Sequence, residues 1–279
     1  MSDKKLQIKD FEKNNYFATQ ELVDVVNAAL FLDKPLLIEG PAGTGKTYLA
    51  KSLSNMLSKE LIRLQCHEVI DEDKAIYEWD YKKQLLSIQN DKNEKDLFTD
   101  EYLIERPILK SLKTSDSLFL VDEIDRSDEE FEALLLEVLA EKQVTIPELG
   151  TVAGEGNNFT ILTSNATRDL SEALRRRCIY FFLDYPSIDI ETKVILSNVE
   201  SISEEKAKKY SLFSSFIRKL NLNKPPSLIE TVEWVKYNHE NNHGDLDSNI
   251  GILIKDIDDQ KLYKEKLKEN NDFKNGSVT

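Results

Sequence analysis

The sequence predicts an α/β protein in which a three-layer unit, a parallel five-stranded sheet with helices on both faces, precedes a small all-helical domain. Three observations predict this class. Short apolar runs suited to buried strands alternate with helical patterns, a glycine-rich turn follows the first run, and strand patterns stop near Pro186. We therefore expect an α/β domain at residues 1–186 and a helical domain with a polar C-terminal tail at residues 187–279.

The strands of this sheet are expected at five apolar runs that alternate with helical spacing. Their predicted ranges are 35–38, 61–64, 118–121, 159–163 and 178–183. Helices are expected at 17–31 and 48–57, and another after Ser127, which has Glu130 three residues on as in a capping box. Because strands and helices alternate along the chain, the sheet is expected to be parallel.

The remaining segments of the chain have weaker patterns. Residues 66–116 are mixed, with Tyr77, Trp79 and Tyr81 alternating with polar residues. Residues 144–158 carry one proline and three glycines, which is typical of a hairpin or a long loop. Beyond the sheet, helical spacing recurs at 189–199, 203–221 and 227–239.

Composition limits the class of protein further. The 279 residues carry a net charge of −14, which argues against binding to nucleic acid or to anionic membranes, since both attract basic surfaces. No run approaches the roughly 18 apolar residues of a membrane span, and the N-terminus has no apolar stretch, so we expect a cytoplasmic protein. Cys66 and Cys178 lack metal-type spacing and are expected to be small buried side chains.

The glycine-rich turn carries the strongest functional signal. It fits the phosphate-loop pattern G-x-x-x-x-G-K-[ST] through Gly40, Pro41, Ala42, Gly43, Thr44, Gly45, Lys46 and Thr47. Between a strand and a helix, such a turn points backbone N–H groups at an anion, and the helix dipole favours negative charge. We expect Lys46 to reach the β- and γ-phosphates of a nucleotide, the Thr47 hydroxyl to ligate Mg²⁺, and Tyr48 to lie beside the nucleotide.

Hydrolysis needs a metal ligand and a group that activates water, and two acids at the end of the third predicted strand supply both. Asp122 would hold Mg²⁺ and Glu123 would act as general base, although paired acids also end strands without any such role. Asn165, after the fourth strand, would bind the γ-phosphate or the attacking water, although an ordinary turn also explains it.

Three successive arginines precede the fifth strand. Arg175, Arg176 and Arg177 repel one another unless an anion or a partner accepts them, although a solvated surface also explains them. An arginine finger presented to a neighbouring subunit's nucleotide would use such a cluster, which by itself leaves open whether Arg176 or Arg177 is the finger. A subunit that presents its finger outward cannot complete its own site, so this arrangement implies a ring.

In this order the motifs resemble those of AAA+ ATPases of the MoxR family, and most nearly its CoxD-like group. Four further stretches are similar to signatures of that group, at residues 62–66, 77–81, 145–151 and 184–186. The resemblance is strong over residues 16–199 and loose beyond them. It implies that Lys46 belongs to the Walker A motif, that Asp122 and Glu123 form the Walker B motif, that Asn165 is sensor 1, and that Arg177 is the finger.

The resemblance also implies an ATP-hydrolysing, chaperone-type enzyme, typically a hexameric ring that works with a von Willebrand A-domain partner on a client metalloenzyme. For CoxD that client is a molybdenum-containing carbon monoxide dehydrogenase. A pre-sensor hairpin is implied at 144–158 and a helix insert near the ring's pore at 66–90. Tyr77, Trp79 and Tyr81 of the insert would then touch the client, unless they are core residues.

Other hypotheses stay open from the sequence. A nucleic-acid-acting AAA+ ATPase, of clamp-loader or restriction-motor type, is disfavoured by the negative charge, and a nucleotide-gated scaffold with little turnover would carry the same motifs. Residues 239–243 match the zinc pattern H-E-x-x-H, but two asparagines and a following glycine indicate a helix end. No arginine occupies the position where the family usually carries sensor 2, which leaves Arg218 or no residue for that role.

Overall fold

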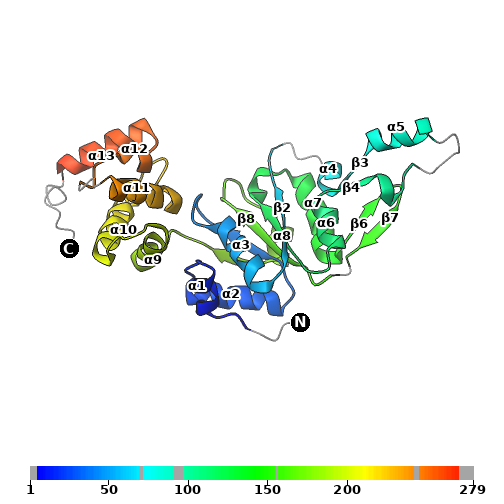
Figure 1. Cartoon of the computed structure of the whole chain (residues 1–279), viewed down its shortest axis with the longest axis horizontal. Coiled ribbons are helices and arrows are strands. Elements are labelled where there is room, and N and C mark those ends of the chain that lie inside the picture. Colours follow the sequence, from blue (N-terminus) through cyan, green and yellow to red (C-terminus); the bar gives the residue numbers. More distant parts are fainter. Residues whose placement is uncertain (1–4, 69–71, 91–96, 155, 242–244, 270–279) are drawn as a thin grey trace. The chain divides into compact units, whose positions relative to one another are not determined.

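A computed structural model describes residues 5–68, 72–90, 97–154, 156–241 and 245–269 of the chain. These residues form two compact units, and Figure 1 labels most of their helices and strands. The first unit is built from the described parts of Met1–Asn14, Thr19–Gly40 and Lys46–Phe182. The second is built from those of Asn15–Ala18, Pro41–Gly45 and Leu183–Thr279.

A parallel five-stranded sheet forms the centre of the first unit, as the sequence predicts, with the strand order β2-β5-β8-β1-β9. Its strands are β1 (Leu36–Glu39), β2 (Glu60–Gln65), β5 (Ser117–Asp122), β8 (Phe159–Ser164) and β9 (Ile179–Phe182). Every residue of β1 and β5 is buried, as expected for strands that helices cover on both faces. With its flanking helices (Figure 1), the sheet completes the predicted three-layer α/β fold.

The helices of the first unit are α1 (Ile8–Lys13), α2 (Gln20–Phe31), α3 (Lys46–Leu57), α4 (Glu72–Ile76), α5 (Tyr81–Asn90), α6 (Pro107–Lys113), α7 (Glu129–Glu141) and α8 (Glu172–Arg177). Side-chain caps start three of them, α2, α7 and α8, at residues that sequence patterns place only approximately. The expected cap of α7 at Ser127 is wrong by one residue, because Asp128 accepts the Phe131 N–H at 2.8 Å. A 3-10 turn, η2 (Ile124–Arg126), ends at Ser127, whose hydroxyl donates back to the Ile124 carbonyl.

The main core of this unit joins the sheet to α6 and α7. Phe119 and Val121 of β5 and Phe131 and Leu135 of α7 belong to it, and each is at most 2% exposed. Burying one such side chain stabilises the fold by roughly 1.5–3 kcal/mol. Packing of this extent fixes the place where β5 ends, and therefore the place of Asp122.

Two small antiparallel sheets join the first unit. One pairs β3 (Tyr77–Trp79) with β4 (Leu103–Glu105), and the other is a hairpin of β6 (Gln143–Ile146) and β7 (Gly150–Ala153). Trp79 is buried and meets the rings of Tyr77 and Phe98 edge-on, with centroids 5.8 and 5.2 Å away. Core packing therefore holds Trp79, whereas the Tyr81 side chain is 64% exposed.

The second unit is helical, with no strand among its described residues. Its helices are α9 (Ile188–Asn198), α10 (Glu204–Arg218), α11 (Leu228–Glu240), α12 (Ile250–Leu253) and α13 (Ile257–Glu269). Trp234 lies at the centre of its core, stacked on Phe213 at 5.4 Å and edge-on to Tyr210 at 5.0 Å between ring centroids. The expected polar tail from residue 270 onward, and residues 242–244 at the end of the H-E-x-x-H match, lie outside the described residues.

Both cysteines are buried, as the sequence predicts, and neither forms a disulfide. Burial raises the pKa of the Cys66 thiol and of the Cys178 thiol to about 12. Among the helices described, none combines the length and the apolar character that crossing a membrane requires.

Candidate functional site

Three neighbouring strands of the sheet end where the sequence motifs begin. The strand order places β8 between β5 and β1, and these strands end at Asp122, Ser164 and Glu39. The Gly40 N–H donates to the Ser164 carbonyl at 3.1 Å, which ties the start of the phosphate loop to the neighbouring strand. Because parallel strands share one carboxyl edge, residues from distant parts of the sequence meet here, as in ligand sites of other open α/β sheets.

Lys46 is the first residue of α3 and is only 6% exposed. Its ammonium donates to the Gly40 carbonyl at 2.8 Å. Burial lowers the pKa of Lys46 from its ordinary value, although the nearby charges of Asp125, Asp122 and Glu123 act in the opposite direction. A buried ammonium at a helix N-terminus is a place where phosphate oxygens are well accommodated, because the helix dipole favours negative charge there.

The middle of the phosphate loop, Pro41–Gly45, belongs to the second unit. Gly43 and Gly45 have φ angles of +75° and +99°, which glycine adopts without strain. A Cβ at residue 43 would lie 2.2 Å from the Cβ of Ser227, and the Leu228 N–H donates to the Gly43 carbonyl at 3.2 Å. Gly43 is therefore required both by its backbone conformation and by the close approach of the start of α11.

Asp122 lies against Thr47 and is 2% exposed. The Thr47 hydroxyl is 3.1 and 3.2 Å from the two carboxylate oxygens of Asp122. The Thr163 hydroxyl donates to Asp122 Oδ1 at 2.5 Å. Arg63 of β2 donates to Oδ2 from Nε at 3.0 Å and from Nη2 at 2.5 Å. Arg63 and Thr163 are site residues that the sequence analysis missed.

The oxygens of Thr47 and Asp122 fit Mg²⁺, which prefers oxygen ligands and is usually held by one or two carboxylates together with substrate phosphates. Among the described residues no group of three or more histidines, cysteines or acids is placed to hold a metal ion. The donor set at this edge is therefore one carboxylate and one hydroxyl, which suits a cation that arrives with a phosphate ligand.

Glu123 follows in the left-handed region, with φ 57° and ψ 50°, which is uncommon for a glutamate. Its N–H donates to the Thr163 hydroxyl at 3.0 Å, so Thr163 binds both members of the acidic pair. The Glu123 carboxylate is 36% exposed and lies 3.7 Å from the Arg126 guanidinium. Unfavourable backbone conformations of this kind cluster at functional sites, where the surrounding structure holds them in place.

The Asn165 loop is held by a third acid, Asp125, that the sequence analysis also missed. Asp125 is buried and accepts from the Asn165 N–H at 3.1 Å and from the Thr167 N–H and hydroxyl at 3.1 and 2.6 Å. Burial alone would raise the pKa of Asp125, but the hydrogen bonds from Thr167 and Asn165 bring it below its ordinary value. An ionised Asp125 therefore fixes the backbone that carries Asn165.

The three arginines of α8 have different surroundings. Arg175 turns inward to Glu39, at 2.9 and 3.1 Å from its carboxylate oxygens. Arg176 is exposed and pairs with Glu172 one turn earlier on its own helix. Arg177 is exposed and donates to the Ala173 carbonyl at 3.2 Å.

Tyr48, which the sequence places beside the nucleotide, lies at the surface of α3 and is 47% exposed.

Arg218, the candidate for sensor 2, is embedded in the second unit. Its guanidinium binds both carboxylate oxygens of Glu191 at 2.9 and 2.7 Å, the Pro226 carbonyl at 2.8 Å and the Thr231 hydroxyl at 3.0 Å. It also lies 4.8 Å from the centroid of the Tyr185 ring. The side chains of this ion pair are 7% and 1% exposed, so Arg218 has a structural role.

We expect Arg218→Met to lower the free energy of unfolding by about 3 kcal/mol, because it leaves the Glu191 carboxylate buried without a partner. Urea unfolding followed by tryptophan fluorescence measures this loss. The double variant Arg218→Met/Glu191→Leu should recover most of it. Lys255→Ala, which removes an exposed partner of Glu230, is the matched control and should cost less than about 1 kcal/mol. Equal costs for the two single variants would contradict the prediction.

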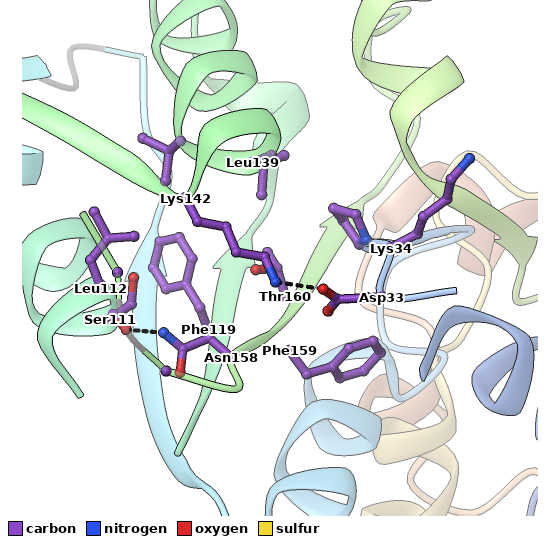
Figure 2. Close-up of a pocket in the computed structure, with 14 residues that line it drawn as sticks. Asp33, Lys34, Ser111, Leu112, Phe119, Leu139, Lys142, Asn158, Phe159 and Thr160 are labelled. Atoms are coloured by element: carbon purple, nitrogen blue, oxygen red, sulfur yellow. Dashed lines mark hydrogen bonds and ion pairs between the residues drawn. The ribbon is translucent and has the colours of Figure 1, made fainter. Parts of the chain in front are cut away.

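A small cavity lies at the opposite, amino-terminal edge of the sheet, where Phe159 begins β8 (Figure 2). Its volume is about 40 Å³, and its wall includes the ion pair of Lys142 with Asp33 at 2.6 Å. Figure 2 also shows Asn158 donating to the Ser111 carbonyl beside it, at 2.6 Å. A cavity of this size holds a few water molecules and no nucleotide. It is separate from the site at Asp122, which lies at the carboxyl edge of the sheet.

Comparison with known proteins gives a family and a fold. The model of the family described as AAA domain (dynein-related subfamily) matches residues 35–178. An uncharacterized protein of Staphylococcus epidermidis is 26% identical over 192 residues, which are 67% of this chain and 68% of that protein. Another, of Staphylococcus haemolyticus, is 28% identical over 190 residues, 66% of this chain and 68% of its own. These alignments span about two thirds of each relative.

Among solved structures, a variant of RuvB from Thermotoga maritima superposes with a TM-score of 0.53. It is 17% identical in sequence, and the superposition covers 93% of this chain and 74% of that chain. At this identity the likeness concerns the fold alone.

Proposed function

Because the chain belongs to the dynein-related subfamily of AAA domains, we propose that it binds ATP with Mg²⁺ and hydrolyses it. The observation that carries the proposal is the contact of the Thr47 hydroxyl with the Asp122 carboxylate, beside the buried ammonium of Lys46. These three groups come from the start of α3 and the end of β5, and together they match the needs of a metal-bound triphosphate.

The roles of the individual groups follow from their chemistry. Lys46 and the backbone N–H groups of residues 43–47 would hold the phosphates, and Thr47 and Asp122 would ligate Mg²⁺. Bound Mg²⁺ supplies positive charge next to the phosphates. Glu123 would take a proton from the attacking water, which its partial exposure permits.

Two further residues would act on the transferred phosphoryl group. Asn165, held by Asp125, would orient the attacking water or bind the γ-phosphate. Arg177, exposed at the end of α8, would reach the nucleotide of a neighbouring subunit, since an exposed cation serves a partner better than its own buried site. This role requires a ring-shaped homo-oligomer, for which a hexamer is the proposed size.

The finer assignment is a MoxR-type, CoxD-like remodelling ATPase. We infer it from the four sequence signatures given above and from the hairpin β6–β7, which lies in the segment where the resemblance implies a pre-sensor hairpin. The proposed partner is a von Willebrand A-domain protein, and the proposed client is a metalloenzyme such as molybdenum-containing carbon monoxide dehydrogenase. The net charge of −14 favours a protein client over nucleic acid.

Equilibrium binding of ATP in the presence of Mg²⁺ tests the proposal. Lys46→Met, which keeps the buried alkyl stem and removes the charge, should weaken ATP binding about 10- to 100-fold, the worth of one or two charge-assisted hydrogen bonds. Lys51→Ala removes an exposed lysine of the same helix and is the matched control, with binding unchanged. Calorimetry that detects no ATP uptake by the unmodified protein, or equal uptake by Lys46→Met, would contradict ATP binding at this loop.

A further inference from the structure

Glu39 is a buried carboxylate next to the phosphate loop that the proposed reaction does not use. It ends β1, directly before Gly40, and is 5% exposed. Its Oε1 accepts from Arg175 at 2.9 Å and from the Ser164 hydroxyl at 3.4 Å, and its Oε2 accepts from the Tyr180 hydroxyl at 2.8 Å. Burying a carboxylate costs free energy unless hydrogen-bond donors replace the lost water, and here three side chains provide these donors.

The cluster fixes the helix that carries the outward arginines. Helix α8 has only six residues, too few to be stable by itself. At its start, the Ser171 N–H donates to the buried Glu132 carboxylate at 2.9 Å, and near its end Arg175 is bound to Glu39. The Arg175 guanidinium also lies 5.6 Å from the centroid of the Tyr180 ring. Two buried carboxylates therefore determine the direction in which α8 ends.

We propose that Glu39 is a positioning residue that acts through Arg175 to aim Arg177 at the nucleotide of the neighbouring subunit. This inference rests on the proposed function, in which Arg177 acts in trans. The same carboxylate is connected to the subunit's own phosphate loop, because Ser164, which donates to it, accepts the Gly40 N–H. One buried cluster thus links the loop that holds a subunit's nucleotide to the arginine that the subunit offers its neighbour.

A mixture of two kinds of subunit isolates this role. Acceptor subunits carry Arg177→Ala, and donor subunits carry Glu123→Gln, so each kind alone should be inactive. In the mixture an acceptor site is completed by a donor's Arg177, and turnover returns. The donor's own hydrolysis is already removed by Glu123→Gln. Any further substitution in the donor therefore changes turnover only through the Arg177 that it supplies to the acceptor site.

We expect Arg175→Met in the donor to lower kcat of the mixture about 10- to 100-fold with KM unchanged, as for a catalytic group displaced by about 1 Å. Because this variant leaves Glu39 without its cation, the double donor Glu39→Leu/Arg175→Met is made as well, in which an apolar pair replaces the ion pair. It should show the same loss of kcat while it binds ATP and assembles as the unmodified donor does. Glu172→Gln in the donor breaks the exposed Arg176 pair and is the matched control, with turnover unchanged.

The outcomes separate this inference from the proposed function. An active mixture whose kcat is unaffected by the assembled double donor overturns the role of Glu39 and leaves the proposed function in place. An inactive mixture of unmodified donor and acceptor overturns the trans arrangement of Arg177, and the inference with it. A loss of kcat confined to the Arg175→Met and double donors supports the role of Glu39.

Discussion

Replacing Glu123 by glutamine is expected to lower kcat for ATP hydrolysis about a thousandfold while ATP binding persists. The amide has the size of the carboxylate but cannot take a proton from water, and general-base catalysis contributes roughly 10²- to 10⁴-fold. The left-handed backbone and the hydrogen bond from the Glu123 N–H to Thr163 do not involve the side chain, so the local structure should stay intact. Phosphate release measures the loss, and calorimetry measures the retained binding.

The matched control for this variant is Glu130→Gln, which removes an exposed acid of the first turn of α7. It changes the net charge by the same amount and should leave both kcat and ATP affinity unaltered. Turnover by Glu123→Gln at the unmodified rate would remove Glu123 from the mechanism. Loss of ATP binding in the same variant would indicate a structural role instead.

Replacing Arg177 by alanine is expected to reduce kcat about a thousandfold or more, again with ATP binding retained. Arginine fingers stabilise the charge that develops on the transferred phosphoryl group and contribute roughly 10³- to 10⁵-fold. Arg177 is exposed, and its hydrogen bond within the described part of the chain is to a backbone carbonyl, so its removal should cost little stability. The rate is measured on assembled protein, and subunits carrying Glu123→Gln should restore it when mixed in.

Arg176→Ala is the comparison that decides between the two exposed arginines. Arg176 pairs with Glu172 on its own helix, and a surface pair of this kind contributes at most about 1 kcal/mol. The fold should therefore tolerate this variant, and because the proposed mechanism assigns the finger to Arg177, we expect a small change in kcat. A larger loss for Arg176→Ala than for Arg177→Ala would transfer the finger to Arg176.

The fold could be predicted wherever the signal is local and repeated. The five strands of the sheet are apolar runs, and the helices between them have a buried stripe, so their order along the chain indicated a parallel sheet. Short elements were missed, because they depend on contacts between distant residues. Strand β3 forms only by pairing with β4, where Tyr77 lies opposite Glu105, and three residues carry too little pattern to predict either strand.

In the candidate site, too, residues in continuous motifs could be predicted, and residues brought together from distant parts of the chain could not. The phosphate loop and the acidic pair are continuous in sequence, so their residue types and spacing identify them. Arg63 and Thr163 reach Asp122 across 59 and 41 positions, and each looks like an ordinary polar residue of its strand. Only the strand order, with β2 and β8 on either side of β5, brings them to one carboxylate. Asp125 was overlooked because its partners, Asn165 and Thr167, lie 40 and 42 positions away.

The two buried thiols make this chain convenient for spectroscopy. The thiolate is the form of cysteine that reacts with maleimides, and at neutral pH Cys66 and Cys178 are both protonated and inaccessible. A cysteine introduced at an exposed position would therefore take up a fluorophore or a spin label alone, without removal of the native pair. One such label in each unit would allow the distance between them to be followed as nucleotide is added.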